Sequence, residues 1–429
     1  MNLSKYTTIL PVSELYHLIY NAKSDKYIIC HKSAYTTHKQ EIIPQTNRLA
    51  QQLVDIEAVI RPDIDEVSEL KRLIESVDFN PTTYHLHINP TLNCNFRCWY
   101  CYEEHKQNSK MDKTTIDSII KYSKKLTKSG SCLRNLIISF FGGEPLMYYN
   151  QIAGPIIKNI YQLCLESQIK FKVHFTTNGL LINQSILDSL EYINASFQIT
   201  LDGGREYHNK VRFIHSGKGS YDIIMNNVYK LINYHHEVLL RINFTSENID
   251  SIPEIINELR AIDEKTKKYL TIDFQRVWQD RPLITEDIII SKIATYSNEL
   301  EKIGLKFSTS LAGPNHVRYS CYGDKKNHIL INYDGNIFLC TARDFEEQNR
   351  FGFITKNGEI HWNEDKLNSY MNNKFTREIC HNCKIAPLCG GGCRQRASES
   401  SDDTSCIYGY THDDINDLIF KRFKMRFLK

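Results

Sequence analysis

The 429-residue sequence has no run of about 18 apolar residues, and its first residues, Met1 to Tyr6, lack the apolar core of an export signal. Both absences argue against a membrane-spanning or exported protein, so we expect a cytoplasmic chain with no membrane partner. The net charge of only +3 argues against a nucleic-acid partner, because nucleic-acid-binding domains gather an excess of Lys and Arg. Internal repeats and low-complexity segments are also lacking, and the length predicts two or three globular units.

Cysteine, by contrast, is abundant, and the sequence contains 13 of them. A secreted disulfide scaffold is normally short and carries an export signal, and neither feature is found here. Metal ligation by thiolates is therefore the better explanation. Oxygen damages exposed iron–sulfur clusters, so a reducing or anaerobic cytoplasm is expected. Three cysteines outside the motifs described below, Cys30, Cys132 and Cys164, are interpreted as free thiols.

Three cysteines stand in the run Cys94-Asn-Phe-Arg-Cys98-Trp-Tyr-Cys101, directly after an apolar stretch that predicts a strand. The C-x3-C-x2-C spacing supplies three thiolates to an iron–sulfur cluster that needs four ligands. Ferredoxin-type clusters use four cysteines and close every iron. A three-cysteine loop leaves one iron open, and this predicts a cluster that binds a substrate or cofactor and does chemistry on it.

Seven further cysteines lie in the C-terminal part of the chain. Their spacing is C-x13-G-x4-C, then C-x2-C-x5-C-x3-C, then a final cysteine; the residues are Cys321, Gly335, Cys340, Cys380, Cys383, Cys389, Cys393 and Cys406. This pattern predicts further metal centres. A zinc ribbon is the alternative to iron–sulfur clusters, because C-x2-C pairs also hold zinc.

Between these two cysteine regions, short β-rich runs alternate with longer amphipathic helices six times. The predicted strands are 84–89, 136–141, 171–176, 197–201, 238–244 and 270–275. The predicted helices are 112–128, 151–166, 184–192, 220–234, 251–260 and 286–303. The alternation predicts a parallel sheet with crossover helices. Six such units fit an α/β fold, a partial (β/α)6 TIM-type barrel, in which functional residues sit at the C-terminal ends of the strands.

Glycine and polar residues follow the predicted strands at these ends. In strand order they are Cys94, Gly142-Gly143-Glu144-Pro145, Thr177-Asn178-Gly179, Asp202-Gly203 and Asn243. Glycine after a strand lets the backbone approach a ligand closely, and a carboxylate such as Glu144 can pair with an ammonium group. The sequence therefore predicts a ligand site at this end of the barrel, beside the three-cysteine loop.

The three-cysteine loop, with Tyr100 before its third cysteine, and the run Gly142-Gly143-Glu144 together resemble the radical S-adenosylmethionine (SAM) superfamily. The resemblance implies a [4Fe–4S] cluster on Cys94, Cys98 and Cys101, whose open iron is chelated by the amino and carboxylate groups of SAM. One-electron reduction by an external flavodoxin- or ferredoxin-type partner would then give methionine and a 5′-deoxyadenosyl radical. The cofactor carries the difficult chemistry, and the protein supplies orientation and a dry site.

The resemblance also implies which residues contact SAM: Tyr100, Gly142, Gly143, Glu144, Asn178, Thr200, Asp202 and Arg212. The Gly142–Glu144 run would hold the methionyl amino group, and Tyr100 would contact adenine. Thr200 and Arg212 would hold the ribose and carboxylate side. Members of the superfamily more often have Ser where Thr200 stands, and both side chains carry a hydroxyl.

The seven C-terminal cysteines and Gly335 resemble the SPASM domain of peptide-modifying radical SAM enzymes. This implies two auxiliary [4Fe–4S] clusters, one on Cys380, Cys383, Cys389 and Cys406, the other on Cys321, Cys340 and Cys393. The second cluster lacks an assigned fourth ligand, because the stretch from Ala312 to His316 has no cysteine where some relatives carry one. His316 and Asp324 are alternative ligands, but we expect an open or substrate-occupied position.

These motifs predict four parts of the chain. They are an N-terminal α+β extension (1–82), a radical SAM partial barrel (83–285), a linker helix and connection (286–313) and a cysteine-rich SPASM domain with its auxiliary clusters (314–429). In the extension, strands are predicted within 6–12 and 15–30, with a turn at 21–25, and helices near 46–58 and 65–77. Such a unit suits the binding of a leader peptide by strand addition. A plain stabilising cap on the barrel is equally compatible with the pattern.

Enzymes of this kind work mostly on peptides and proteins, so the resemblance implies a maturase for a ribosomally made precursor peptide. The expected product is a thioether, a C–C or C–O crosslink, or a related oxidation. The alternative is an anaerobic sulfatase-maturating enzyme, which oxidises Cys or Ser to formylglycine. Those enzymes tend to place Asp directly after the cysteine that matches Cys340, where this sequence has Thr341. They also generally lack so long an N-terminal extension. A non-enzymatic electron carrier or scaffold would have no use for a SAM site.

A general base would assist the reaction if an auxiliary cluster accepts the electron from the substrate. The candidates are Asp324, Asp334 and Asp344, and the sequence places none of them near the substrate. Asp334 is predicted to belong to the turn from Asn332 to Asn336 between two strands.

Overall fold

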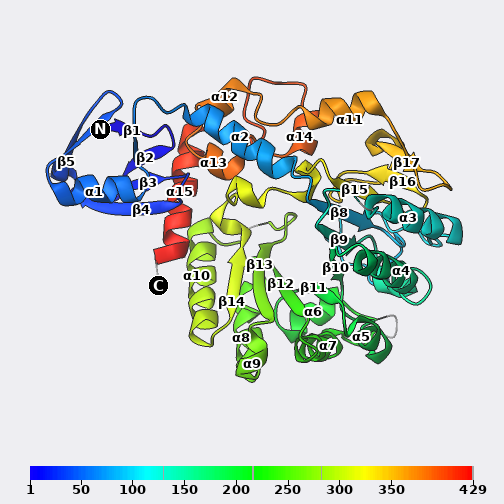
Figure 1. Ribbon diagram of the computed structural model, residues 1–429. Coiled ribbons are helices and arrows are strands. Elements are labelled where there is room, and N and C mark those ends of the chain that lie inside the picture. The colour runs from blue at the N-terminus through cyan, green and yellow to red at the C-terminus, as the bar shows by residue number, and fades with distance from the viewer. Residues whose placement is uncertain (129, 215–216, 282, 428–429) are drawn as a thin grey trace. The chain divides into compact units, whose positions relative to one another are not determined.

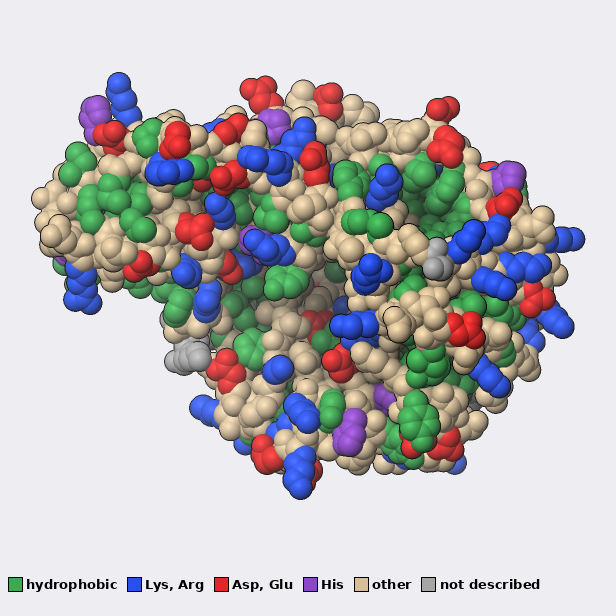
Figure 2. All heavy atoms as spheres, in the orientation of Figure 1, with side chains coloured by type: hydrophobic (Ala, Val, Ile, Leu, Met, Phe, Trp, Pro, Cys, Tyr) green, Lys and Arg blue, Asp and Glu red, His purple; other side chains and the backbone are tan. Residues whose placement is uncertain are grey.

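The structure is a computed structural model that describes residues 1–128, 130–214, 217–281 and 283–427. The chain forms two compact units. The barrel unit contains residues 81–311 and 327–364; the cysteine-rich unit contains residues 1–80, residues 312–326 and the C-terminal segment from Asp365. Among the helices in the described ranges, none is both long and apolar enough to span a membrane. Figure 2 shows basic and acidic side chains interspersed over the visible face, in line with the small net charge.

A curved, largely parallel sheet forms the barrel unit (Figure 1). Its parallel strands are β8 (Thr83–Ile88), β9 (Asn135–Phe140), β10 (Lys170–Thr177), β11 (Asn194–Leu201), β12 (Glu237–Phe244), β13 (Leu270–Arg276), β14 (Lys306–Thr309) and β15 (His328–Ile331). The order across the sheet is β14-β13-β12-β11-β10-β9-β8-β15, and it continues into the antiparallel strands β16 (Asn336–Phe338), β17 (Gly352–Ile354) and β18 (Ile360–Trp362). The α/β class and the TIM-type barrel are confirmed.

Helices connect the parallel strands and cover the convex side of the sheet (Figure 1). They are α3 (Lys113–Leu126), α4 (Ala153–Glu166), α5 (Gln184–Leu190), α6 (Arg205–Val211), α7 (Tyr221–Asn233), α8 (Ile252–Leu259), α9 (Glu264–Lys267) and α10 (Glu286–Lys302). Side-chain caps fix several starts; the Asp112 carboxylate, for example, accepts from the Thr115 amide at 2.7 Å. The six predicted strands and six predicted helices are confirmed, and the short helices α6 and α9 were not predicted.

The two faces of the barrel sheet differ in polarity, because side chains alternate along each strand. One set is aromatic and aliphatic and fully buried; Phe175 stacks between Phe140 and Phe197 with centroid separations of 5.2 Å. The alternate set carries hydroxyl, amide, imidazole and charged groups. The apolar set packs beneath the helices, so the polar set faces the inside of the curve.

Two strands of the sheet lie outside the predicted barrel. β14 falls in the predicted linker and pairs in parallel with β13. β15 falls in the predicted C-terminal domain and pairs in parallel with β8, placing His328 opposite His85. The compact units therefore divide the chain differently from the predicted domains, because hydrogen bonding to the barrel edges draws these segments into the sheet. The predicted turn at Asn332–Asn336 is confirmed between β15 and β16.

The cysteine-rich unit begins with two small antiparallel sheets, of order β2-β3-β4 and β5-β6-β1-β7. The strands are β1 (Asn2–Leu3), β2 (Thr7–Pro11), β3 (Tyr16–Asn21), β4 (Lys26–His31), β5 (Tyr35–His38), β6 (Glu41–Pro44) and β7 (Val59–Ile60). The helices are α1 (Asn47–Asp55), α2 (Glu66–Asp78), α11 (Glu364–Met371), α12 (Glu378–His381), α13 (Ala386–Cys389), α14 (Arg394–Glu399) and α15 (His412–Phe427). The strands, turn and helices predicted for residues 6–77 are confirmed.

One hydrophobic core joins segments of this unit that are far apart in the sequence. Leu10 and Leu18 of the first sheet and Ile74 of α2 pack with Ile385 near α13 and with Ile419 of α15. The N-terminal strands therefore share their core with the C-terminal cysteine segment. These strands are therefore an integral part of the cysteine-rich unit and not an independent extension.

Candidate active site and metal centres

The loop after β8 brings Cys94, Cys98 and Cys101 together. The Cys101 amide donates to the Cys98 carbonyl at 3.0 Å, and the Phe96 amide points at the Cys94 sulfur at 3.4 Å. Burial raises the pKa of the Cys94 thiol to about 12, and the nearby Glu144 carboxylate raises it further. Burial also raises the pKa of Cys98. Thiolates in this loop need a cation to be stable, and iron supplies one, so the three residues fit the cluster that the sequence predicts.

The glycines after β9 lie against the start of this loop. Gly142 and Gly143 have φ angles of +82° and +51°, a region that favours glycine. A Cβ on Gly142 would come within 2.7 Å of the Asn89 side chain, and one on Gly143 would collide with the Asn93 carbonyl. The Glu144 amide donates to that same carbonyl at 2.9 Å. The glycines are therefore required for the loop to pack, whatever else they bind.

The carboxylate of Glu144 is fully buried and accepts three hydrogen bonds. They come from the Thr177 hydroxyl at 2.7 Å, the Asn178 amide at 2.8 Å and the Leu146 amide at 3.0 Å. Burial nevertheless raises its pKa. The Asn178 side chain continues to the cysteine loop by donating to Asn95 at 2.7 Å. Glu144 and Asn178, both predicted as SAM contacts, thus meet beside the three cysteines.

Tyr100, Asp202 and Arg212 form a second buried cluster in the barrel unit. The Tyr100 hydroxyl donates to Asp202 at 2.6 Å, and Arg212 donates to Tyr100 at 2.7 Å and to Asp202 at 2.5 Å. Sequence reasoning named all three but missed that they bond to one another. Thr200 lies half-buried on the polar face of β11. The predicted contacts of these residues with SAM stay predictions.

A cavity of about 560 Å³ opens beside the cluster of Tyr100, Asp202 and Arg212. Its walls include Tyr100, Asp202, Val277 and Gln279, and Trp99 stands at its side. The Gln279 side chain donates to the Tyr100 carbonyl at 3.0 Å, tying the loop after β13 to the cysteine loop. A polar ligand can therefore enter at the C-terminal ends of the strands, as the TIM-type fold predicts.

Glu103 is a site residue that sequence reasoning missed. One of its carboxyl oxygens accepts from the Gly143 amide at 3.2 Å, and the other is buried with no hydrogen-bond partner among the described residues. Burial raises its pKa to about 8, and the charge of Glu144 raises it further. A cationic group bound here would pair with the carboxylates of both Glu103 and Glu144. The available signal was an acid two residues after Cys101.

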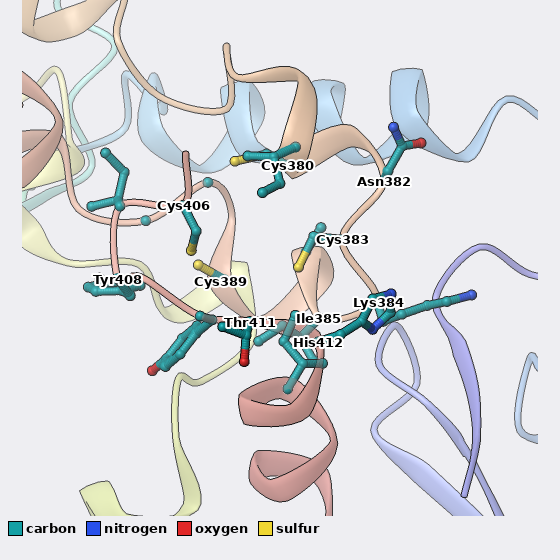
Figure 3. A pocket seen from close by; sticks show the side chains of 17 residues that line it. Cys380, Asn382, Cys383, Lys384, Ile385, Cys389, Cys406, Tyr408, Thr411 and His412 are labelled. Atoms are coloured by element: carbon teal, nitrogen blue, oxygen red, sulfur yellow. The ribbon is translucent and has the colours of Figure 1, made fainter. Parts of the chain in front are cut away.

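Four cysteines of the cysteine-rich unit line one cavity of about 210 Å³, with apolar walls that include Ile385 and Ile415. Figure 3 shows Cys380, Cys383, Cys389 and Cys406 around it, on α12, the following loop, the end of α13 and the segment before α15. Burial raises the pKa of Cys380 to about 11 and that of Cys389 to about 12, and the neighbouring thiols add to both shifts. Cys383 and Cys406 therefore lie close enough to Cys380 and Cys389 to raise their pKa values across the cavity.

This cavity fits the predicted four-cysteine cluster in its donor set. Within the described residues, no three Cys, His, Asp or Glu side chains converge on one point to hold a single ion. The thiols surround a space instead, which is what a cluster with one cysteine for each of four irons requires. Gly390, Gly391 and Gly392, each with positive φ, carry the chain past the third cysteine.

The remaining predicted ligands lie in different units. Cys321 and Cys393 belong to the cysteine-rich unit, and Cys340 follows β16 in the barrel unit. The ligand set of this cluster stays a prediction. The His316 side chain, an alternative ligand, accepts from the Arg318 amide at 3.2 Å.

The candidate bases have other partners. Asp324 is buried and pairs with Lys374 at 2.8 Å, and Lys374 also pairs with Asp78 at 2.9 Å. Asp344 is exposed and accepts from the Asn349 side chain. Asp334 accepts from the Asn336 amide within its turn. The general base remains unassigned.

Comparison with known proteins places these features in a family. Residues 88–259 match the radical SAM superfamily. The cysteine-type anaerobic sulfatase-maturating enzyme of Clostridium novyi is 24% identical over 331 residues, which is 71% of this chain and 85% of that protein. The solved structure of anSMEcpe with bound AdoMet has a TM-score of 0.58 at 18% identity, covering 81% of this chain and 98% of the other. Streptococcus suis SuiB bound to its precursor peptide SuiA has a TM-score of 0.53 at 13% identity, covering 94% and 98%.

The three-cysteine loop at the strand ends, the buried Glu144 beside it and the four-cysteine cavity agree with these matches. The cofactors are SAM and [4Fe–4S] clusters, with auxiliary clusters of the SPASM type. Residues 88–259 match the radical SAM superfamily, and the chain resembles the peptide-modifying enzymes with a radical SAM domain.

Proposed function

We propose that this enzyme is a maturase for a ribosomally made precursor peptide and that it forms a thioether, C–C or C–O crosslink or a related oxidation. The observation that carries the proposal is the match to SuiB over 94% of this chain, which necessarily includes most of the 80 N-terminal residues. SuiB was solved with a precursor peptide bound. The sulfatase-maturase structure covers 81% of the chain.

The chemistry depends on groups that the loop residues would hold. When bound, the cluster and SAM would supply the radical chemistry that removes a hydrogen atom from the peptide. The protein's part is to bind and orient. Cys94, Cys98 and Cys101 would ligate three irons, and Glu144 with Glu103 would attract the methionyl ammonium. The polar inner face of the barrel would receive the peptide.

The four-cysteine cavity would serve electron transfer away from the oxidised peptide. Its thiols lie in the apolar surroundings of Ile385 and Ile415, which exclude water from a bound cluster. A flavodoxin- or ferredoxin-type protein would supply the first electron. Because iron–sulfur clusters need reducing conditions, we place the reaction in the cytoplasm.

The N-terminal sheet offers a place for a leader peptide. β2 and β4 are the outer strands of the β2-β3-β4 sheet, and each pairs only with β3 among the described strands. An extended leader can add to such an edge by main-chain hydrogen bonds. The shared core with α13 and α15 also supports the structural role that the sequence left open, because the strands stabilise the cysteine segment.

The second candidate is a sulfatase-maturating enzyme, which the relative from Clostridium novyi favours. Thr341 stands where such enzymes tend to have Asp, and here it is buried. Formylglycine formation from Cys would remove the sulfur from the peptide, whereas a crosslink keeps the sulfur and removes two hydrogen atoms.

The test is anaerobic. The reconstituted protein is incubated with SAM, dithionite and the short peptide encoded beside its gene, and 5′-deoxyadenosine and the peptide mass are measured. Loss of two hydrogen atoms, together with a fragment pattern interrupted at two linked residues, supports the maturase. Loss of sulfur with a new aldehyde would instead establish the sulfatase-type reaction. Absence of 5′-deoxyadenosine from the fully loaded enzyme with every peptide offered would refute both.

A further inference from the structure

The inside of this barrel is polar where TIM-type barrels are usually filled by Val, Ile and Leu. Pairing in the sheet aligns Thr200 of β11 with Arg241 of β12, Arg241 with Asp273 of β13, and Asp273 with Ser308 of β14. Side chains at directly paired positions point to the same face, so these four residues form one row across four strands. The flanking residues Leu240 and Ile242 are fully buried on the opposite face.

The members of this row are held together by hydrogen bonds around one carboxylate. Asp273 accepts from Ser308 at 2.6 Å, from the Gln275 side chain at 3.0 Å and from the Arg241 Nε atom at 3.3 Å. The Asp273 side chain is only 8% exposed, whereas that of Arg241 is 34% exposed. Both oxygens of Asp273 are therefore engaged, and the accessible member of the pair is the cation.

Arg241 has unused donors. The only hydrogen bond of its side chain among the described residues uses Nε, so the two terminal nitrogens remain available. A guanidinium fixed through Nε presents these nitrogens as a fork, which matches the two oxygens of a carboxylate. Fixing the fork in advance also lowers the entropy lost when a ligand binds.

We propose that Arg241, positioned by Asp273, is a carboxylate-binding residue inside the barrel that selects precursor peptides with an acidic side chain or a free C-terminus next to the reacting residue. The proposal rests on the proposed function, since it assumes a peptide in the barrel. Asp273, Gln275 and Ser308 act by positioning Arg241.

A separate arginine on the predicted SAM side favours the peptide over SAM as the source of the carboxylate that Arg241 binds. The residues predicted to contact SAM lie in the cysteine loop and at the ends of β9 to β11. Arg241 is paired directly with Thr200, a predicted SAM contact, so it borders the predicted SAM side, and the row then leads away from that side through Asp273 of β13 and Ser308 of β14. The predicted SAM side also has an arginine of its own, Arg212.

The experiment selects binding peptides from a random library, so the natural substrate need not be identified first. The library, made as free synthetic peptides with unblocked C-termini, is selected anaerobically by binding to the reconstituted full chain with SAM present, and the bound peptides are sequenced by mass spectrometry. The wild type is compared with Arg241→Gln, Arg241→Lys, Asp273→Asn and the control Arg260→Gln, an exposed arginine after α8. SAM affinity and melting temperature are measured for each protein.

We expect the wild type and Arg260→Gln to enrich Asp, Glu or a free C-terminus at one position. Arg241→Gln should lose this enrichment, with affinity for the selected peptides falling about 10-fold or more. Arg241→Lys should fall between the two because it keeps the charge without the fork. In Asp273→Asn, Arg241 keeps its charge but loses its fixed position. Acidic residues should therefore still be enriched, but spread over several positions of the peptide.

Three outcomes would overturn the proposal. They are no acidic enrichment by the folded wild type, the same enrichment by Arg241→Gln, and a loss of SAM affinity in Arg241→Gln with peptide selection unchanged, which would assign the fork to SAM. Failure of the proposed function is seen separately, as absence of 5′-deoxyadenosine. An Arg241-dependent acidic selection would still stand in that case.

Discussion

The three-cysteine loop and the four-cysteine cavity gather the same side chain in opposite surroundings. The loop thiols lie beside the buried carboxylates of Glu144 and Glu103 and near the guanidinium of Arg212. The cavity thiols are enclosed by isoleucines and by Tyr408 and Tyr410. Polar surroundings suit a site that exchanges a charged ligand at each turnover, and apolar surroundings suit a cluster that stays closed. The two environments therefore support the proposed roles, with SAM cleavage at the loop and electron transfer through the cavity.

Removal of a loop cysteine should have the largest effect. Cys98→Ala should abolish 5′-deoxyadenosine formation and lower the iron content by about four per chain, because a cluster cannot be held by two thiolates. Iron assay and chromatography of the SAM products measure both. The exposed Cys132→Ala is the matched control and should keep its iron. If Cys98→Ala still cleaves SAM, the loop is not the reaction centre.

Removing two cavity cysteines should have a different effect. Cys389→Ala with Cys406→Ala should also lower iron by about four per chain, but SAM cleavage should fall far less than in Cys98→Ala. The melting temperature should drop by roughly 5–10 °C, because a bound cluster stabilises the unit whose core surrounds it. Calorimetry and iron assay test this. Equal losses of SAM cleavage in both variants would erase the distinction between the sites.

A smaller change tests the polar surroundings of the loop. Glu144→Gln replaces an acceptor of three hydrogen bonds with an amide whose NH2 faces donors, which should cost about 2 kcal/mol of stability. SAM affinity should fall about 10-fold or more, since the ammonium loses a carboxylate. Denaturant unfolding and equilibrium binding measure these effects. The exposed neighbour Glu104→Gln should match the wild type, and a variant of Glu144 with normal SAM affinity would contradict the assigned role.

The smallest expected difference between the two units is in how much stability each loses in acid. Burial lowers the pKa of His87 in the barrel unit to about 3, and its ring contacts His328 at 3.0 Å. The folded state then binds fewer protons than the unfolded state below pH 6.5, so stability falls as the pH drops from 6.5 toward 3. Between pH 7 and 5 the cost is about 2 kcal/mol for His87 alone.

His87→Gln should remove the part of this dependence that belongs to His87 and leave the part that belongs to His328 and His174, whose pKa values burial also lowers. The exposed His38→Gln in the cysteine-rich unit should leave the slope unchanged. Denaturant midpoints followed from pH 7 to pH 5 give the two slopes. A slope in His87→Gln that equals the wild-type slope would contradict the role given to His87.

Local pattern was enough to predict the barrel and its cysteine motifs. The six strand–helix units follow from periodicity, and Cys94, Glu144 and Asn178 were placed by the rule that functional groups follow parallel strands. The strand β15 was missed because the four residues His328–Ile331 form a short run in a turn-rich segment, and the run gains its meaning only by pairing with β8. The same holds for β14 at the other edge.

Contacts between distant segments could not be predicted from the sequence. Nothing in the spacing of Arg241, Asp273 and Ser308 shows that they share a row, because the strand register that aligns them depends on the whole sheet. The shared core of Leu18 and Ile419 is hidden for the same reason. The sequence shows Glu103 as an acid two residues after Cys101. Only the structure shows that one of its oxygens accepts from the Gly143 amide and that the other is buried without a partner among the described residues.

That shared core has a consequence for synthesis on the ribosome. Ile415 and Ile419 are made roughly 340 residues after Ile74, which takes roughly 20 to 70 seconds at about 5–20 residues per second. During that time the N-terminal strands have emerged while their apolar partners in α15 do not yet exist. The barrel segment can fold in the interval, but the unit around the four cysteines cannot close until translation is nearly finished. Iron loading of that unit is therefore a late event in the life of each chain, and truncation within α15 would leave the first-made strands exposed to aggregation.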